Sequence, residues 1–298
     1  MNKKYPFLLS VTIIVTMAVF MFSQVNAQTK LLIRCDDIGM CNTVNAAAEK
    51  LIGTGIPFSA SVMFTCPWYK EAVEILKANP QISIGIHLVL NSEWNNYKWG
   101  PVAGRTTVPS LVDGSGHFYE SEGDFAKGGY KLDEVETELR AQIERAINSG
   151  LQIDYVDPHM NMAVSTPELR NIVEKLTAEY HLGISEYFNE SYQTLWETAP
   201  EKKLSRLLEV VNKLENNKVN LLVIHLGMET GEMAALIDMN NPDDPYRVSQ
   251  HRQAELNALT SRAFENAVQK NNVKFITYKE LISQAGLKSM NRPSPAEY

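Results

Sequence analysis

Residues 30–37 of the chain read Lys-Leu-Leu-Ile-Arg-Cys-Asp-Asp, a mostly apolar run that ends directly in two aspartates. Its apolar residues follow one another instead of alternating with polar ones, which is typical of a strand covered on both faces in a parallel sheet. Polar groups at the carboxyl end of such a strand lie where parallel-sheet proteins build their sites. This stretch therefore predicts an inner strand of an α/β fold, with two carboxylates at its functional end.

Runs of the same character recur along the chain and alternate with stretches of helical spacing. The predicted strands are residues 30–36, 59–64, 82–90, 153–157, 183–187, 220–225 and 273–278. The predicted helices are residues 43–51, 67–78, 132–148, 167–181, 201–214 and 249–269. A strand followed by a helix, repeated about seven times, predicts a single α/β domain with either a (β/α) barrel or a doubly wound parallel sheet.

The N-terminus has the features of a secretory signal peptide. Lys3 and Lys4 precede an uncharged apolar stretch at residues 7–22, and Val25-Asn26-Ala27 places small residues at cleavage-site spacing. An uncleaved anchor is the alternative, although a bilayer span usually needs ~20 apolar residues. We expect residues 1–27 to be removed and the mature domain, 28–298, to be periplasmic or secreted, without stable membrane association.

Charge and cysteine content exclude two classes of protein. Without the signal peptide, 26 basic and 35 acidic residues remain, a net charge of −9 with histidine neutral, which argues against a nucleic-acid partner. Cys35, Cys41 and Cys66 form no CxxC pair, and three is an odd number for an exported chain. Buried thiols are therefore expected rather than a disulfide framework.

Candidate site residues lie at or just beyond the carboxyl ends of several predicted strands. Asp36 and Asp37 end the first strand, His87 lies in the third, His159 follows the fourth by two residues, and His225 ends the sixth. One carboxylate and two imidazoles are a common ligand set for a catalytic divalent metal, and a second carboxylate could take a proton from the attacking water. Each residue alone could instead be a helix cap or a hydrogen-bonded core group, but their shared position favours a site.

Asp157 has two possible roles beside this set. It could replace one of the ligands, or it could support an imidazole through a hydrogen bond, since it immediately precedes Pro158 in a turn-like position.

Four segments of the chain resemble the signature segments of the YdjC-like carbohydrate deacetylases, in the same order. These segments are Leu32–Gly39 (LIRCDDIG), Gly85–Leu88 (GIHL), Asp157–Met162 (DPHMNM) and Val223–Gly227 (VIHLG). The likeness continues through Arg252–Glu255 to the final predicted strand and so covers nearly all of the mature chain. It implies a distorted (β/α) barrel and a metal-dependent hydrolase that removes N-acetyl groups from amino sugars in oligosaccharides or glycans.

The resemblance also implies a role for each candidate residue. Asp37, His87 and His159 would hold one divalent metal ion, Asp36 would be the general base, and His225 would protonate the departing amine. Imidazole and carboxylate ligands suit zinc, whereas the family suggests magnesium or a related ion.

The sequence departs from the family pattern at three positions. Arg34 and Cys35 stand where an asparagine and a small residue are usual, and Arg34 could pair with Asp36 and weaken it as a base. Asn161 stands where a second histidine is common. A non-catalytic carbohydrate-binding relative, and a metal-dependent hydrolase of another bond on the same scaffold, therefore remain as alternative functions.

Two long irregular segments, residues 91–130 and 237–249, follow predicted strands, and loops of this length are usually functional or disordered. We expect their side chains either to contact a sugar or to anchor the loops to the barrel. The candidates for substrate contact are Trp94, Tyr97, Trp99, Phe118, Tyr119 and Arg247.

Overall fold

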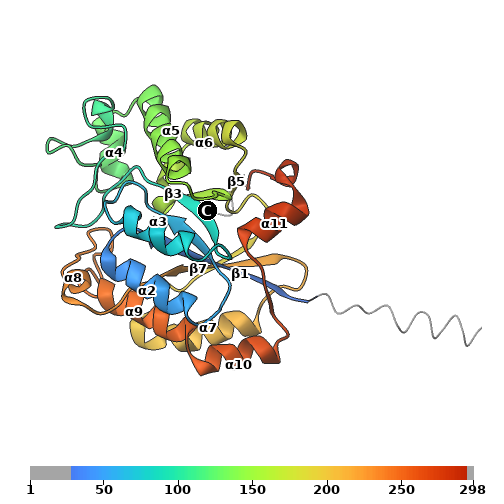
Figure 1. Cartoon of the computed structure of the whole chain (residues 1–298). Helices are drawn as coiled ribbons and strands as arrows, with labels where there is room; N and C mark the ends of the chain where they lie inside the picture. Colours follow the sequence, from blue (N-terminus) through green and yellow to red (C-terminus); the bar gives the residue numbers. More distant parts are fainter. Residues whose placement is uncertain (1–27, 294–298) are drawn as a thin grey trace, which may run out of the picture.

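A parallel sheet forms the frame of the protein (Figure 1). The structure is a computed structural model that describes residues 28–293. Its strands are β1 (Lys30–Ile38), β2 (Ser59–Val62), β3 (Ser83–Leu88), β4 (Tyr155–Pro158), β5 (Gly183–Ile184), β6 (Ser191–Thr194), β7 (Val219–His225) and β8 (Lys274–Phe275). They are ordered β5-β4-β3-β2-β1-β7-β6, and β8 pairs with the start of β1. Within the described residues β5 and β6 do not pair with each other, so the sheet curls into an incomplete barrel.

Helices cover the outside of this sheet. In Figure 1, α5 and α6 lie on one side of it, and α7, α9 and α10 lie on the other. The helices are α2 (Asn42–Ile52), α3 (Tyr69–Lys77), α4 (Glu122–Gly128), α5 (Leu132–Asn148), α6 (Pro167–Tyr180), α7 (Lys203–Asn212), α8 (Gly231–Ala234), α9 (Val248–Leu259), α10 (Arg262–Lys270) and α11 (Tyr278–Ala285). Across the described range, no helix combines the length and the apolar character that a membrane crossing requires.

Alternate residues of β1 contribute to two separate apolar clusters. Leu31 and Ile33 belong to the large cluster formed with the outer helices, whereas Leu32 packs in a small cluster with Tyr155 and Tyr278. The small cluster also contains residues of β7, so it fills the inside of the barrel. The polar side chains of the cavity line the other part of the interior, toward the carboxyl ends of the strands.

A close approach between β3 and β4 explains one glycine in this interior. A Cβ at Gly85 would lie 2.3 Å from Cζ of Tyr155, so no larger residue fits beside that ring. The Tyr155 hydroxyl and Ser61 Oγ are 2.8 Å apart, and this hydrogen bond fixes the ring against β2.

The α/β class, the single domain and the distorted barrel are confirmed. Each of the seven predicted strands is present, and β6 is an additional short strand. The predicted helix at residues 249–269 is divided into α9 and α10, because the Ser261 side chain accepts a hydrogen bond from Phe264 N and caps a new helix. The three cysteines are free and buried, as expected. The predicted signal peptide, residues 1–27, lies outside the described residues.

Candidate active site

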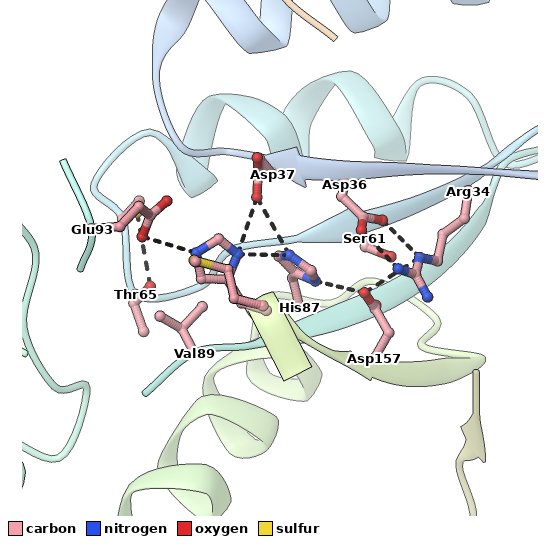
Figure 2. A network of polar contacts seen from close by, with 12 residues as sticks. Arg34, Asp36, Asp37, Ser61, Thr65, His87, Val89, Glu93 and Asp157 are labelled. Atoms are coloured by element: carbon pink, nitrogen blue, oxygen red, sulfur yellow. Dashed lines mark hydrogen bonds and ion pairs between the residues drawn. The ribbon is translucent and has the colours of Figure 1, made fainter. Parts of the chain in front are cut away.

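The three predicted metal ligands, Asp37, His87 and His159, lie together at the carboxyl ends of the strands. Figure 2 labels Asp37 and His87. Asp37 Oδ1 is 3.4 Å from His87 Nε2 and 3.4 Å from His159 Nδ1. All three residues are buried, and their ligand atoms lie within 4.8 Å of one another. Asp37 has a left-handed backbone with φ of 63°, which is uncommon for a residue other than glycine, so Asp36 and Asp37 point in different directions. Strands β1 and β3 and the segment directly after β4, which are distant in sequence, thus deliver one compact ligand set.

Hydrogen bonds orient both imidazoles so that one nitrogen of each faces Asp37. His87 Nδ1 donates to Asp157 Oδ2 at 2.6 Å, and His159 Nε2 donates to Glu93 Oε2 at 3.0 Å. Asp157 therefore has the supporting role that was one of its two predicted alternatives. Such partners fix the ring orientation and tautomer of metal-binding histidines. The sequence did not predict Glu93 as a partner of His159, because Glu93 lies in an irregular segment and not at the end of a predicted strand.

Electrostatics favours a cation beside these residues. Burial alone would raise the pKa of Asp37, but Arg252 and the two imidazoles hold it well below its usual range. Burial opposes protonation of His87, but the carboxylates of Asp157 and Asp36 raise its pKa to about 10. His159 responds in the same way to Glu93 and Asp37, and its pKa rises to about 9. Protons are thus attracted to the positions where a metal would bind.

An unused acceptor shows that a metal fits here. Asp37 Oδ2 accepts a hydrogen bond from Arg252 Nη2 at 2.5 Å, whereas its buried Oδ1 accepts none in the described part of the chain. This oxygen and the two facing nitrogens form the donor set of one carboxylate and two imidazoles that suits zinc or a related divalent ion.

Asp36 is held by the arginine that precedes it by two positions. Arg34 Nε and Nη2 donate to the two carboxylate oxygens of Asp36 at 2.7 and 2.8 Å, and Nε lies 3.5 Å from Asp157 Oδ2 (Figure 2). The pairing expected from the sequence is therefore present. Asp36, His87 and Asp157 also lie close enough to hold a metal, but the Arg34 guanidinium already supplies the positive charge between the two carboxylates. The set built on Asp37 is the better metal site.

His225 faces the same cavity from β7. It is paired in register with Asp36 of β1, so the two side chains project from the same face of the sheet. Burial lowers the pKa of His225 to about 4; the carboxylates of Asp37 and Asp36 oppose this change. Its Nδ1 is buried and has no hydrogen-bond partner within the described residues. The neutral ring therefore offers a nitrogen to a substrate or a proton.

A cavity of about 420 Å³ contains all five predicted site residues. Of the loop residues expected to contact a sugar, only Trp94 lines it. Trp99 donates its Nε1 to Asn91 O, and Phe118 is buried, so both anchor the loop. Arg247 binds Asp244 instead. The cavity walls also include residues that sequence reasoning missed, among them Met160, Tyr192 and Trp196.

Comparison with known proteins supports this description. A model of the YdjC-like protein family matches residues 30–270, which include every site residue named above. A carbohydrate deacetylase of Enterococcus faecalis is 26% identical over 266 residues, covering 85% of this chain and 98% of that protein. A carbohydrate deacetylase of Brevibacillus brevis is 32% identical over 155 residues, covering 52% of this chain and 58% of that protein.

Solved structures support the fold. A cellobiose-phosphate cleavage protein of Enterococcus faecalis superposes with a TM-score of 0.69 at 24% identity, covering 85% of this chain and 99% of that one. The Xyl-CE4 domain of a multidomain xylanase from the hindgut metagenome of Trinervitermes trinervoides gives a TM-score of 0.50 at 9% identity. The match covers 87% of this chain and 92% of that one.

Proposed function

Since this chain belongs to the YdjC-like family, we propose that it is a hydrolase that removes N-acetyl groups from amino-sugar-containing oligosaccharides or glycans. The observation that carries the proposal is the convergence of Asp37, His87 and His159 on one buried point of a cavity that also contains Asp36 and His225. A metal-dependent hydrolase needs this combination of a ligand set with separate proton-transferring groups.

Asp37, His87 and His159 would hold one divalent ion, magnesium or zinc. When bound, such an ion polarises the acetyl carbonyl and lowers the pKa of water, so no covalent nucleophile is needed. Asp157 and Glu93 would keep the two imidazoles turned toward the ion.

Asp36 would take a proton from the attacking water while the new carbon–oxygen bond forms. His225 would then protonate the nitrogen as the carbon–nitrogen bond breaks, which gives acetate and a free amine. Since a pKa of about 4 leaves the His225 ring neutral at neutral pH, the proton that it gives to the nitrogen must first reach it from Asp36, which took that proton from the water. The pairing of Asp36 with His225 across β1 and β7 places donor and acceptor on neighbouring strands.

Release of acetate with a free amine tests this function. The purified protein is assayed on N-acetylated oligosaccharides beside matched esters and phosphoesters, and its metal content is measured. We expect amide hydrolysis with about one divalent ion bound per chain. His87→Ala and His159→Ala should lose the metal, whereas Asp36→Asn should keep the metal and lose turnover. Full metal retention in both histidine variants would contradict the ligand assignment.

A non-catalytic carbohydrate-binding protein is the second candidate, and one observation favours it. Both oxygens of Asp36 accept hydrogen bonds from Arg34, so an attacking water would have to compete with the guanidinium for this carboxylate. A wild-type protein that binds metal and N-acetylated sugar but releases no acetate would support this candidate over the hydrolase.

We also propose that the mature protein starts after Ala27 and acts in the periplasm or outside the cell. Lys3, Lys4 and the apolar stretch at residues 7–22 support this location. N-terminal sequencing of the protein recovered from fractionated source cells tests it, and an intact Met1 in the cytoplasmic fraction would contradict it.

A further inference from the structure

The charges that line the active-site cavity are unequal. Its carboxylates are Asp36, Asp37, Glu93, Glu186, Glu197 and Asp238, and its cationic side chains other than histidine are Arg34 and Arg252. A substrate with a negatively charged substituent would therefore enter a cavity in which six carboxylates face at most four cationic side chains, the two arginines and the rings of His87 and His159. No lysine is among the described residues that line the cavity.

Both arginines are already paired with carboxylates of the same cavity, and neither is more than 4% exposed. Arg34 is 4% exposed and uses both edges of its guanidinium on Asp36 and Ser185. Arg252 is 1% exposed and donates to Asp37. The remaining nitrogens of Arg252 make no hydrogen bond within the described residues, but its guanidinium lies 5.7 Å from the ring centroids of Trp94 and Trp196, which cover it.

Three of the carboxylates have no strong cationic partner. Glu186 lies 3.8 Å from Arg34 Nη1, which already binds Ser185, and burial raises the pKa of Glu186. Asp238 accepts a hydrogen bond from Asn240 N, and burial raises its pKa as well. Glu197 is exposed at the cavity wall. A phosphate placed among these groups would be repelled by Glu197 and by the ionised forms of Glu186 and Asp238.

Neutral hydrogen-bonding groups line the same cavity and are available to sugar hydroxyls or an acetyl oxygen. The Nε1 of Trp94 is buried without a partner among the described residues, although the side chain is 2% exposed and lines the cavity. Asn240 and Asn241 add amide groups beside Asp238. A buried donor without a partner is costly, so it indicates a ligand atom that accepts from it.

We propose that this cavity selects N-acetylated sugars that are uncharged or carry a free amine, and rejects sugars that carry a phosphate or carboxylate. The proposal rests on the proposed function, because the acetylated sugar is the substrate of that reaction. An amine on a neighbouring sugar would be protonated and would find the carboxylates of Glu186, Glu197 and Asp238 within the same cavity.

Matched substrates test this selection. Acetate release by the metal-loaded protein is measured with a disaccharide of N-acetylglucosamine, with its singly phosphorylated form, and with the form that carries one free amine. We expect kcat/KM for the phosphorylated disaccharide to be at least about tenfold below that of the neutral one, with a smaller difference at high salt. Equal or faster hydrolysis of the phosphorylated sugar would overturn the inference.

Equilibrium binding separates this inference from the hydrolase proposal. The same sugars are titrated calorimetrically into protein treated with a chelator, which prevents phosphate from binding a metal. Weaker binding of the phosphorylated sugar than of the neutral sugar supports the inference, even if neither sugar releases acetate. The absence of acetate release from both sugars would refute only the hydrolase proposal. Equal or tighter binding of the phosphorylated sugar would overturn the inference in this assay too.

A charge reversal at the cavity wall sharpens the test. Glu197→Lys introduces a cation beside the substrate and should reduce the preference for the neutral sugar several-fold. Glu209→Lys is the matched control, because Glu209 is an exposed residue of α7 that does not line the cavity. This substitution changes the net charge of the protein by the same amount as Glu197→Lys. An equal loss of preference in both variants would show that the overall charge, and not the cavity, sets the selection.

Discussion

His87 and His159 have strongly raised pKa values because buried carboxylates surround them. The facing nitrogens of the two rings lie 3.0 Å apart and share a hydrogen bond, and the raised pKa values keep at least one proton on this pair at neutral pH when no metal is present. A metal must displace that proton to bind. Metal affinity should therefore rise with pH, by up to roughly tenfold per unit for each proton displaced, and level off above the two pKa values. Competition with a chelator at several pH values from 6 to about 9 measures this slope. An affinity that is constant over this range would contradict the protonated state of this pair of rings.

Glu93 is expected to act on the metal only through His159. Glu93→Ala removes the acceptor for His159 Nε2 and should weaken metal binding by about 10- to 100-fold. Glu93→Gln keeps an acceptor without the charge and should give an intermediate loss. Glu120→Ala, a half-exposed carboxylate in the same long segment that pairs with Lys98, is the control and should leave metal affinity unchanged.

At the scale of elements, contact between β3 and β4 depends on Gly85. Gly85→Ala would place a Cβ against the fully buried Tyr155 ring, and the hydrogen bond to Ser61 opposes movement of that ring. We expect the free energy of unfolding, measured in urea, to fall by about 1–3 kcal/mol. Gly114→Ala is the matched control, because a Cβ there would contact nothing within 4 Å. A similar loss in both variants would point to general loop or strand effects instead of this contact.

The main strands could be predicted because their apolar runs carry the signal of two-sided burial. β6 could not, because its residues Ser-Tyr-Gln-Thr are polar and partly exposed at the edge of the sheet, where burial imposes no apolar pattern. The break between α9 and α10 was also missed, although Ser261 is a typical capping residue, because the apolar spacing continues across it.

At the scale of the molecule, the candidate site was predictable to the extent that strand ends determine it. Parallel strands present their carboxyl ends at one edge of the sheet, independently of the conformation of the loops. For this reason the side chains of Asp37, His87 and His159 converge. Glu93 and Trp196 come from segments between regular elements, and their positions depend on tertiary packing that no local pattern encodes.

A metal bound by residues of β1, β3 and the segment after β4 would stabilise the whole fold, because unfolding separates its ligands. A metal at 100 times its dissociation constant should add about 2.7 kcal/mol to the free energy of unfolding and raise the melting temperature. Asp37→Ala should abolish this increase. Because the substitution also leaves Arg252 without its carboxylate partner, the stability of each variant is compared with and without metal. Asp36→Asn should retain the increase while losing acetate release, because Asp36 pairs with Arg34 and is not a ligand in the proposed site. If Asp36→Asn loses the metal-dependent increase and Asp37→Ala keeps it, the ligands are Asp36, His87 and Asp157, and the assignment of the two aspartates must be exchanged.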